Sequence, residues 1–475
     1  MSSLPRLPLL FGATLIVALA GCATPLPASP ELPAAPATFA RAAEAPTSTA
    51  AAPVGGAWWS VFADPVLDGL IERAAESNTG VQQAAARLAQ ARAAAGAAGA
   101  ARAPQLALNA GASRQGGPLI NAAGANGNLF EAGASIAWEV DVAGRLSHAE
   151  RAATLDVQAR DALLRQARLL MQAEIAQHYF ALRAIDQERA LRQADLATLQ
   201  ETQRLVERRR AAGLAPEQEV ARARAETGAA EAEMPALQRR REALEHALAW
   251  LAGTHPGALR IAANTAPFQL PVVPAGIPAA VLARRPDVAA AEQGLQAARA
   301  RVGAAGNLWA PGFSLTAGGG QASVELGDLI KTAARSWTLG ALLSLPLFDG
   351  GRREARLDAA QADLQLAAVQ YREQVLVALR EVEDQLSALR WLREQASALR
   401  VTQDDADRAA ALAQSRYERG LTSQLEVLDA RAAAQRHRHA ALQVQAARQQ
   451  ATVALVRALG GGWGPAPEAT AMLAR

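Results

Sequence analysis

Apolar residues recur at coiled-coil spacing across the stretch 351–420, which has no proline and no internal glycine. They are separated by three or four residues and form the series Leu364, Ala368, Tyr371, Val375, Leu379, Val382, Leu386 and Leu389. Two successive four-residue steps near Val375 shift the heptad phase, which locally unwinds a left-handed supercoil. The pattern predicts one helix of roughly 70 residues, about 105 Å long. Such a helix must pack against other helices, because no compact core can enclose it.

The same plan occurs twice along the chain, at an offset of 207 residues (for example 311 − 104). Identical residues at this offset include the pairs Val81/Val288, Gly99/Gly306, Pro104/Pro311, Gly144/Gly351, Gly213/Gly420 and Gly253/Gly460. The offset predicts a second long helix at 144–213. A repeat of this length indicates two structurally equivalent halves, which we assign to 58–265 and 285–463.

Each half also contains two segments in which apolar and polar residues alternate, a pattern typical of strands with one apolar face. We expect strands at about 104–115, 129–141, 312–323 and 336–349. Their length suits a tilted crossing of a bilayer, although soluble hairpins show the same alternation. The connecting loops would then lie outside the cell. Four strands are too few to close a membrane barrel, which needs about eight or more, so the chain must share strands with copies of itself.

The first 21 residues have the positive charge, short apolar run and small-residue exit of a secretory signal. The end of the run, 19–22, resembles the lipobox of bacterial lipoproteins, so Cys22 is the expected lipidation site. Cys22 is the only cysteine, which excludes an intrachain disulfide. The residue after the cysteine is Ala23 rather than aspartate, which by resemblance to enterobacterial lipoprotein sorting favours the outer membrane. Residues 22–57, rich in Pro and Ala, are expected to be a lipidated tether.

Charge and composition exclude several functions. The formal net charge is +3, and removal of Arg6 with the signal leaves 3 − 1 = +2, so the arginine clusters at 208–210 and 239–241 are expected to be solvated helix faces rather than a nucleic-acid surface. No nucleophile, base or metal set is assembled, and His437 and His439 point to different sides of a helix. We therefore expect no enzyme activity, no metal and no cofactor beyond the lipid on Cys22.

Several motifs together resemble the TolC family of outer-membrane channel proteins, most closely its NodT and OprM lipoprotein branch. They are the lipobox, Trp58-Trp59, and the segments 285–313, 138–145 (WEVDVAGR), 345–352 (LPLFDGGR) and 419–431 (RGLTSQLEVLDAR). The resemblance implies an α+β membrane protein, a homotrimer with a twelve-stranded outer-membrane barrel continued by a periplasmic α-helical barrel. It also implies an equatorial domain that includes the linker 266–284 and the chain ends, with 464–475 as a C-terminal tail.

The same resemblance implies the partners: a periplasmic adaptor, an inner-membrane pump, which we expect to be of the resistance-nodulation-division type, and outer-membrane lipid. The channel would conduct small molecules such as drugs, toxic organics or metal ions passively to the exterior. Two alternatives remain open on the residues alone. One is a type I protein-secretion channel, and the other is a periplasmic coiled-coil adaptor or structural lipoprotein, which would not need four amphipathic strands.

The candidate functional site is the turn after each long helix. Gly213 and Gly420 supply the left-handed residue that ends a helix, and with Leu214 and Leu421 they are the expected adaptor-docking tips. Just beyond the second turn, Glu426 and Asp429 are three residues apart and share a helix face. They match the acidic pair that the family places at its periplasmic gate, although they also suit a plain solvated helix start. In the first half, Arg222 stands at the counterpart of Asp429, where it could pair with an acid.

Overall fold

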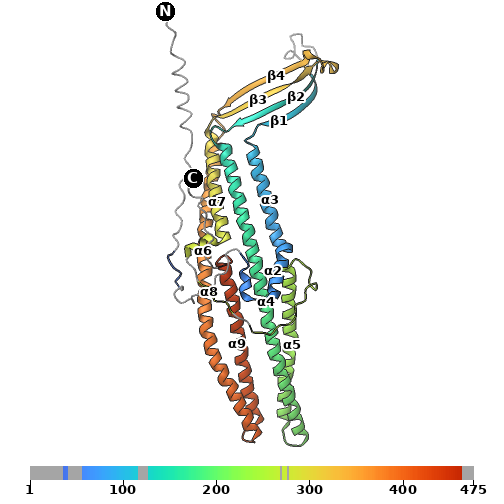
Figure 1. The fold of residues 1–475 in the computed structure, drawn as a ribbon, viewed down its shortest axis with the longest axis vertical. Coiled ribbons are helices and arrows are strands. Elements are labelled where there is room, and N and C mark those ends of the chain that lie inside the picture. Colours follow the sequence, from blue (N-terminus) through green and yellow to red (C-terminus); the bar gives the residue numbers. More distant parts are fainter. Residues whose placement is uncertain (1–35, 41–55, 116–126, 268–269, 275–277, 463–475) are drawn as a thin grey trace, which may run out of the picture. The chain divides into compact units, whose positions relative to one another are not determined.

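The computed structural model describes residues 36–40, 56–115, 127–267, 270–274 and 278–462, and Figure 1 shows its helices and strands. The helices are α2 (Pro65–Ser77), α3 (Thr79–Ala100), α4 (Arg145–Ala211), α5 (Glu217–Leu251), α6 (Pro278–Arg284), α7 (Pro286–Gly306), α8 (Arg352–Glu418) and α9 (Gln424–Ala458). The strands are β1 (Gln105–Gln115), β2 (Gly127–Val140), β3 (Gly312–Ser323) and β4 (Arg335–Ser344). Short 3₁₀ turns are η2 (Trp58–Phe62), η3 (Asn307–Trp309), η4 (Leu326–Asp328) and η5 (Thr332–Ala334).

The two long helices are confirmed: α4 and α8 each contain 67 residues, or about 100 Å at 1.5 Å per residue. The predicted seam of α8 faces inward, because Leu364, Val375, Val382 and Leu386 are at most 9% exposed and the other seam positions are half-buried. The first residues of α4 and α8 are 207 apart (352 − 145), as are those of α5 and α9. The elements therefore follow the offset found in the sequence.

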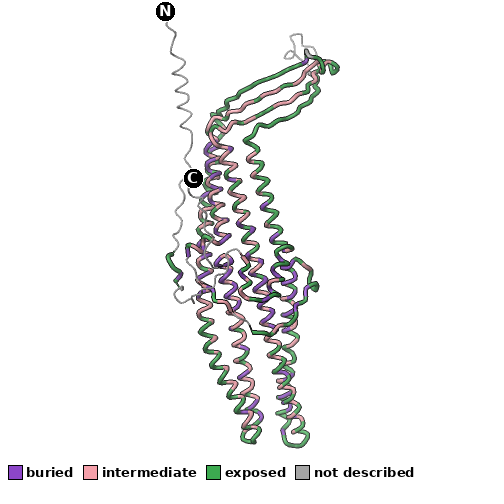
Figure 2. The backbone as a smooth tube through the Cα atoms, in the orientation of Figure 1, coloured by how far each residue is buried: buried purple, intermediate pink, exposed green. Residues whose placement is uncertain are grey.

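The chain divides into two compact units. The strand unit consists of Arg87–Asp161 and Ala290–Arg372, with the sheet and the adjoining parts of α3, α4, α7 and α8. The helix unit is built on Ala162–Ala289 and the described part of Glu373–Arg475, together with α2 and the start of α3. Each unit has its own buried residues (Figure 2), and in the strand unit Leu295, Ala298, Val302 and Leu364 form a core between α7 and α8.

The four strands form one antiparallel sheet in the order β1-β2-β3-β4. Residues directly opposite one another in a sheet share a face, and the register places Trp138 opposite Leu315, which lies opposite Ala341. The predicted apolar sides of the strands consequently form a single apolar face. That face is uncovered in the described chain, because Leu108, Trp337 and Leu339 are at least 76% exposed.

One strand boundary differs from the prediction of 336–349. β4 ends at Ser344, five residues before the expected end, although the alternation of apolar residues continues to Leu347. Pro346 has no N–H to donate and its ring restricts the backbone of the residue before it, so the sheet pairing stops there. Leu347 and Phe348 are 86% and 91% exposed.

A buried aromatic cluster begins the helix unit. Asp64 caps α2 by accepting hydrogen bonds from the N–H groups of Val66 and Leu67, and Pro65 is the first residue of that helix. The same carboxylate accepts hydrogen bonds from Tyr179 Oη and Arg183 Nη1, both at 2.7 Å. Asp64 therefore ties the first short helix to the middle of α4.

Parts of the predicted domain map lie outside the described residues, namely the signal 1–21, Cys22, most of the tether and the tail 464–475. The short described piece of the tether packs on the helix unit. Phe39 is 3% exposed, and Ala40 N donates to Glu383 Oε1 at 2.5 Å. An aromatic side chain within the Pro- and Ala-rich stretch explains why this piece packs. None of the described helices combines the length and hydrophobicity that a membrane-spanning helix requires.

Candidate functional site

The turns that follow α4 and α8 have the same backbone geometry. Gly213 and Gly420 have φ angles of +76° and +73°, the left-handed conformation that glycine adopts most easily. The N–H of Leu214 donates to Arg209 O at 2.8 Å, and the N–H of Leu421 donates to Arg416 O at 2.9 Å. These six-residue loops are Schellman caps. The predicted helix ends are therefore confirmed at both turns.

The leucine after each glycine points away from the helices. Leu214 and Leu421 are 70% and 64% exposed, and a side chain added at Gly213 or Gly420 would meet nothing within 4 Å. Each turn thus presents one large apolar side chain on an open surface. Figure 1 shows the α4–α5 and α8–α9 hairpins that these turns close.

The second turn leads directly into the acidic pair. Ser423 is the N-cap of α9, and its side chain accepts a hydrogen bond from the N–H of Glu426, a role that serine commonly has. The Glu426 carboxylate also accepts a hydrogen bond from the Thr422 hydroxyl. Glu426 and Asp429 are both exposed. Their side chains are accessible to solvent and ions in the single chain.

Asp429 is not unpaired. Arg222 Nη2 on α5 donates to Asp429 Oδ1 on α9 at 2.9 Å, and Arg222 Nε donates to Glu226 Oε1 at 3.0 Å. Arg222 and Asp429 are 207 residues apart, so equivalent positions of the two halves meet. The pairing expected for Arg222 is thereby found, and it links one hairpin to the other within the helix unit.

A second link between the hairpins was not predicted from the sequence. Arg209 Nη1 on α4 donates to Tyr417 Oη on α8 at 3.0 Å. Both residues lie in the last turns of their helices, close to the glycine turns. The signal available in the sequence was the repeat offset. Arg222 and Asp429 show that equivalent positions of the two halves face each other, and the separation of Arg209 and Tyr417, 208 residues, differs from the offset of 207 by one.

Farther from the tips, the helix unit buries a histidine beside charged groups. His439 on α9 is 7% exposed, and its Nδ1 is 3.9 Å from Glu188 Oε1 on α4. Burial and the charge of Arg192 lower the pKa of His439, against the opposing effect of nearby carboxylates. His439 lines a cavity of about 520 Å³ between α4, α5 and α9. His439 is therefore held neutral in the folded protein at neutral pH.

This burial predicts a specific pH dependence. As the pH falls below about 6.5, the ordinary histidine value, the unfolded chain binds a proton at His439 before the folded chain does. The unfolded state is then favoured, so the residue destabilises the fold in acid. We expect His439→Gln to lose less thermal stability than the unsubstituted protein between about pH 7.5 and about pH 5.5. Thermal unfolding followed by circular dichroism checks this, with the less buried His437→Gln as control. Equal acid losses in His439→Gln and the unsubstituted protein would contradict it.

Metal chemistry has no support among the described residues. No group of three or more His, Cys, Asp or Glu side chains in that part of the chain could hold a metal ion. Cys22, the expected lipidation site, lies outside the described residues. The geometry thus leaves the hairpin tips, with their exposed leucines, acidic pair and two interhelix links, as the candidate site.

Comparison with known proteins identifies the family. The model of the family described as "Outer membrane efflux protein" matches residues 70–254 and again residues 277–461. Both ends of the two matches are 207 residues apart (277 − 70 and 461 − 254), the offset seen in the sequence. The matches cover most of the described chain.

Relatives and a solved structure agree with this match. The chain is 32% identical over 419 residues to the pyoverdine export outer membrane protein OpmQ of Pseudomonas aeruginosa, covering 86% of this chain and 87% of OpmQ. It is 30% identical over 409 residues to the cation efflux system protein CusC of Escherichia coli O157:H7, covering 86% and 88%. The structure of the outer-membrane channel OprN superposes with a TM-score of 0.84 at 31% identity, covering 92% of this chain and 99% of OprN.

This is a family of channels rather than of enzymes, and its members are located in the outer membrane. The likeness extends over both halves of the chain and favours a channel over a periplasmic adaptor. The chain therefore belongs to the outer membrane efflux protein family and acts as an outer-membrane efflux channel.

Proposed function

We propose that three copies of this chain form the outer-membrane duct of a tripartite efflux system. The observation that carries the proposal is the sheet. It has one exposed apolar face, and among the described residues no strand pairs with the outer edge of β1 or of β4. Unpaired backbone groups cannot be left in hydrocarbon. Three copies joined edge to edge would supply twelve strands, which is enough to close a barrel.

The long helices support the same assembly. Large apolar side chains remain exposed along α8, at Leu366, Val369, Leu376, Trp391, Val401 and Leu412. Placed at the 100° per residue of an α-helix, these positions fall within an arc of about 100°. A single uncovered apolar stripe on so long a helix indicates a partner helix. In the proposed trimer the partner is a helix of the next copy, and the helices together form the periplasmic tunnel.

The hairpin tips are the proposed docking surface for the periplasmic adaptor, with Leu214 and Leu421 as its apolar contacts. The adaptor would connect the duct to an inner-membrane pump, which we propose to be of the resistance-nodulation-division type. The tunnel conducts passively, so the pump selects the cargo. The relatives are named for cargoes as different as pyoverdine and cations, which supports a duct that accepts small molecules of several classes.

Lys331 provides a direct test of which end of the sheet faces the outside of the cell. It is the only lysine of the chain, it lies between β3 and β4 at the sheet end away from the helices, and its side chain is 63% exposed. A membrane-impermeant amine reagent applied to intact cells should label the protein at Lys331, and Lys331→Arg should abolish the labelling. Labelling that requires disruption of the outer membrane would contradict the proposal.

Glu426 and Asp429 are the proposed gate. Three copies of two carboxylates around a narrow opening attract cations and repel anions. The Arg222–Asp429 ion pair would hold the hairpins of each copy together and so favour the closed state. A single exposed pair contributes little, but three copies of it would act together in the trimer.

We expect Arg222→Glu to raise the open-channel conductance in planar bilayers, because it places like charges at 222 and 429. If the hairpins move together, the open population should increase by roughly 3- to 150-fold. The charge exchange Arg222→Asp with Asp429→Arg should restore the closed behaviour.

In the acidic pair itself, Glu426→Ala with Asp429→Ala should reduce the block of the channel by divalent cations. Unchanged conductance and unchanged cation block in all these variants would contradict the proposal that Glu426, Asp429 and the Arg222–Asp429 pair form the gate.

A further inference from the structure

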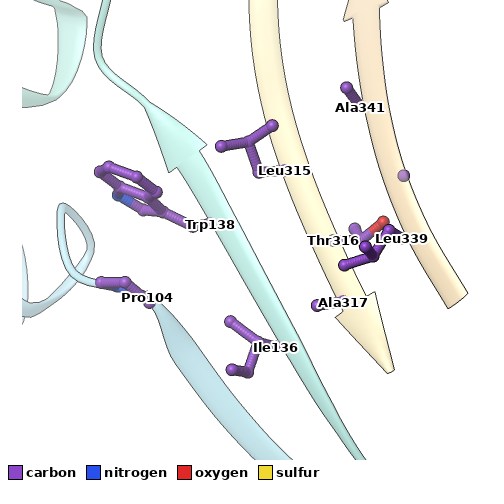
Figure 3. Close-up of a pocket in the computed structure, with 9 residues that line it drawn as sticks. Pro104, Ile136, Trp138, Leu315, Thr316, Ala317, Leu339 and Ala341 are labelled. Atoms are coloured by element: carbon purple, nitrogen blue, oxygen red, sulfur yellow. The ribbon is translucent and has the colours of Figure 1, made fainter. Parts of the chain in front are cut away.

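The apolar face of the sheet is not flat but contains a furrow. A hollow of about 530 Å³ lies among residues of β2, β3 and β4 and the segment before β1, and Figure 3 shows Trp138, Ile136, Leu315 and Leu339 around it. A second hollow of about 360 Å³ shares Ile136, Ala317 and Leu339 with the first and extends to Trp337. The two hollows therefore form one elongated depression within the strand unit.

The furrow results from the sizes of neighbouring side chains. Along its floor lie Ala134, Ala317 and Gly319, and the register places Ala134 directly opposite Gly319. Larger side chains stand on both sides of this row, with Ile136 and Trp138 on β2 and Leu339 on β4. Small residues at neighbouring positions of adjacent strands leave a continuous depression, whereas branched or aromatic side chains at the same positions would fill it.

The lining offers almost no hydrogen-bonding group to a ligand. The indole N–H of Trp138 donates to Arg102 O at 2.9 Å, so the one polar atom of that ring is already used within the chain. Apart from the hydroxyls of Thr316 and Thr338, the lining side chains are apolar. An occupant must therefore be hydrocarbon.

The position of the furrow specifies the occupant further. From Ala134 to Trp138 is four residues, or about 14 Å along a strand. Trp138 lies three residues before Asp141, which accepts hydrogen bonds from the first N–H groups of α4. The furrow thus occupies the half of the sheet next to the helices, which is the periplasmic half under the proposed function. The furrow crosses β2, β3 and β4 on the apolar face of the sheet, whereas a second copy would join through the backbone edges of β1 and β4.

We infer that the furrow binds one acyl chain of a phospholipid from the periplasmic leaflet of the outer membrane. The inference rests on the proposed function, because the apolar face must be turned to lipid. A straight, unbranched acyl chain fits a narrow depression of this length. When it lies in the furrow, the apolar surfaces of the acyl chain and of the furrow are both removed from contact with mobile lipid. The site would hold one lipid in a fixed place beside the strand-to-helix junction.

Photocrosslinking tests the inference. The full chain is reconstituted in phosphatidylethanolamine vesicles that contain a lipid with a diazirine in its acyl chain, and crosslinked peptides are mapped by mass spectrometry. We expect several-fold more label at Ala134 and Ala317 than at Leu108 and Leu343, although the two leucines are 85% and 66% exposed. Ala317→Leu fills the furrow and should reduce its labelling several-fold, and Ala341→Leu is a second filling variant. Ala110→Leu, on the same face but outside the furrow, should leave the labelling unchanged.

Each outcome has a distinct meaning. Label spread over the apolar face in proportion to exposure would overturn the furrow but keep the barrel. No label anywhere on that face would overturn the proposed membrane-facing sheet itself. The acyl chain on Cys22 is the alternative source, so the experiment is repeated with Cys22→Ser exported by a non-lipoprotein signal. Furrow labelling that arises only in Cys22→Ser would show that the protein's own lipid fills the furrow, which would overturn the phospholipid assignment.

Discussion

Arg241→Ala should lower the free energy of unfolding by about 3–5 kcal/mol, the usual cost of breaking a buried ion pair. Arg241 Nε donates to Asp186 Oδ1 at 2.7 Å and Nη2 donates to Ile261 O at 2.6 Å. Its Nη1 is 2.8 Å from Glu245 Oε1. The side chains of Asp186 and Glu245 are 1% and 4% exposed. Removal of the guanidinium leaves the buried carboxylate of Asp186 without its ion-pair partner, and it leaves Glu245 with only Arg260 Nη1, at 3.7 Å.

Denaturant-induced unfolding of the purified protein, followed by the loss of helical circular dichroism, measures this effect. Arg240→Ala is the matched control, because its side chain is 58% exposed and its nearest carboxylate oxygen, on Glu188, is 3.7 Å away. We expect that control to change the stability by no more than about 0.5 kcal/mol. Similar losses in the two variants would show that the network around Arg241 does not hold α4, α5 and the following segment together.

Leu379→Pro should prevent assembly of heat-resistant trimers. Leu379 lies near the middle of α8, half-buried and three residues from Val382, which is fully buried. Proline there removes the N–H that bonds to the carbonyl four residues earlier and costs about 3 kcal/mol or more in each helix. A kink at this point also turns the two ends of the exposed α8 stripe out of line.

Electrophoresis of unheated and heated samples distinguishes trimers from single chains. Leu379→Ala is the control, because it truncates the same side chain and leaves the helix hydrogen bonds intact. We expect the alanine variant to retain trimers. Normal heat-resistant trimers of Leu379→Pro would show that a continuous α8 is not needed for assembly.

The sequence predicted the long helices and three of the four strands to within about two residues, for physical reasons. A heptad pattern without proline or glycine admits one structure, and glycine in the left-handed conformation marks its end, as at Gly213 and Gly420. The apolar alternation at 336–349 predicted a longer β4 than the structure has. The side-chain pattern does not show where backbone pairing stops, and Pro346 interrupts that pairing even though the side chains continue to alternate.

The candidate site was predicted less completely. The caps and the acidic pair are local features, so the sequence around Glu426 and Asp429 contains the information for them. The Arg209–Tyr417 link and the burial of His439 depend on how the two hairpins pack. Those contacts join residues about 200 or more positions apart, and spacing along one helix cannot reveal them. The repeat offset is the one long-range signal in the sequence. It put Arg222 at the counterpart of Asp429, and the structure identifies Asp429 as the acid with which Arg222 pairs.

Closure of the barrel between copies is the central claim, and disulfide crosslinking of the sheet edges tests it most directly. Asn109→Cys on β1 is combined in turn with Ser336→Cys, Thr338→Cys and Gly340→Cys on β4, since a disulfide forms only when the Cα atoms are within about 7 Å. The native Cys22 would be blocked by its lipid. For one of these pairs we expect oxidation to give crosslinked species of two and three chains, with none larger. Crosslinks confined within single chains, or a series that continues beyond three, would contradict the account.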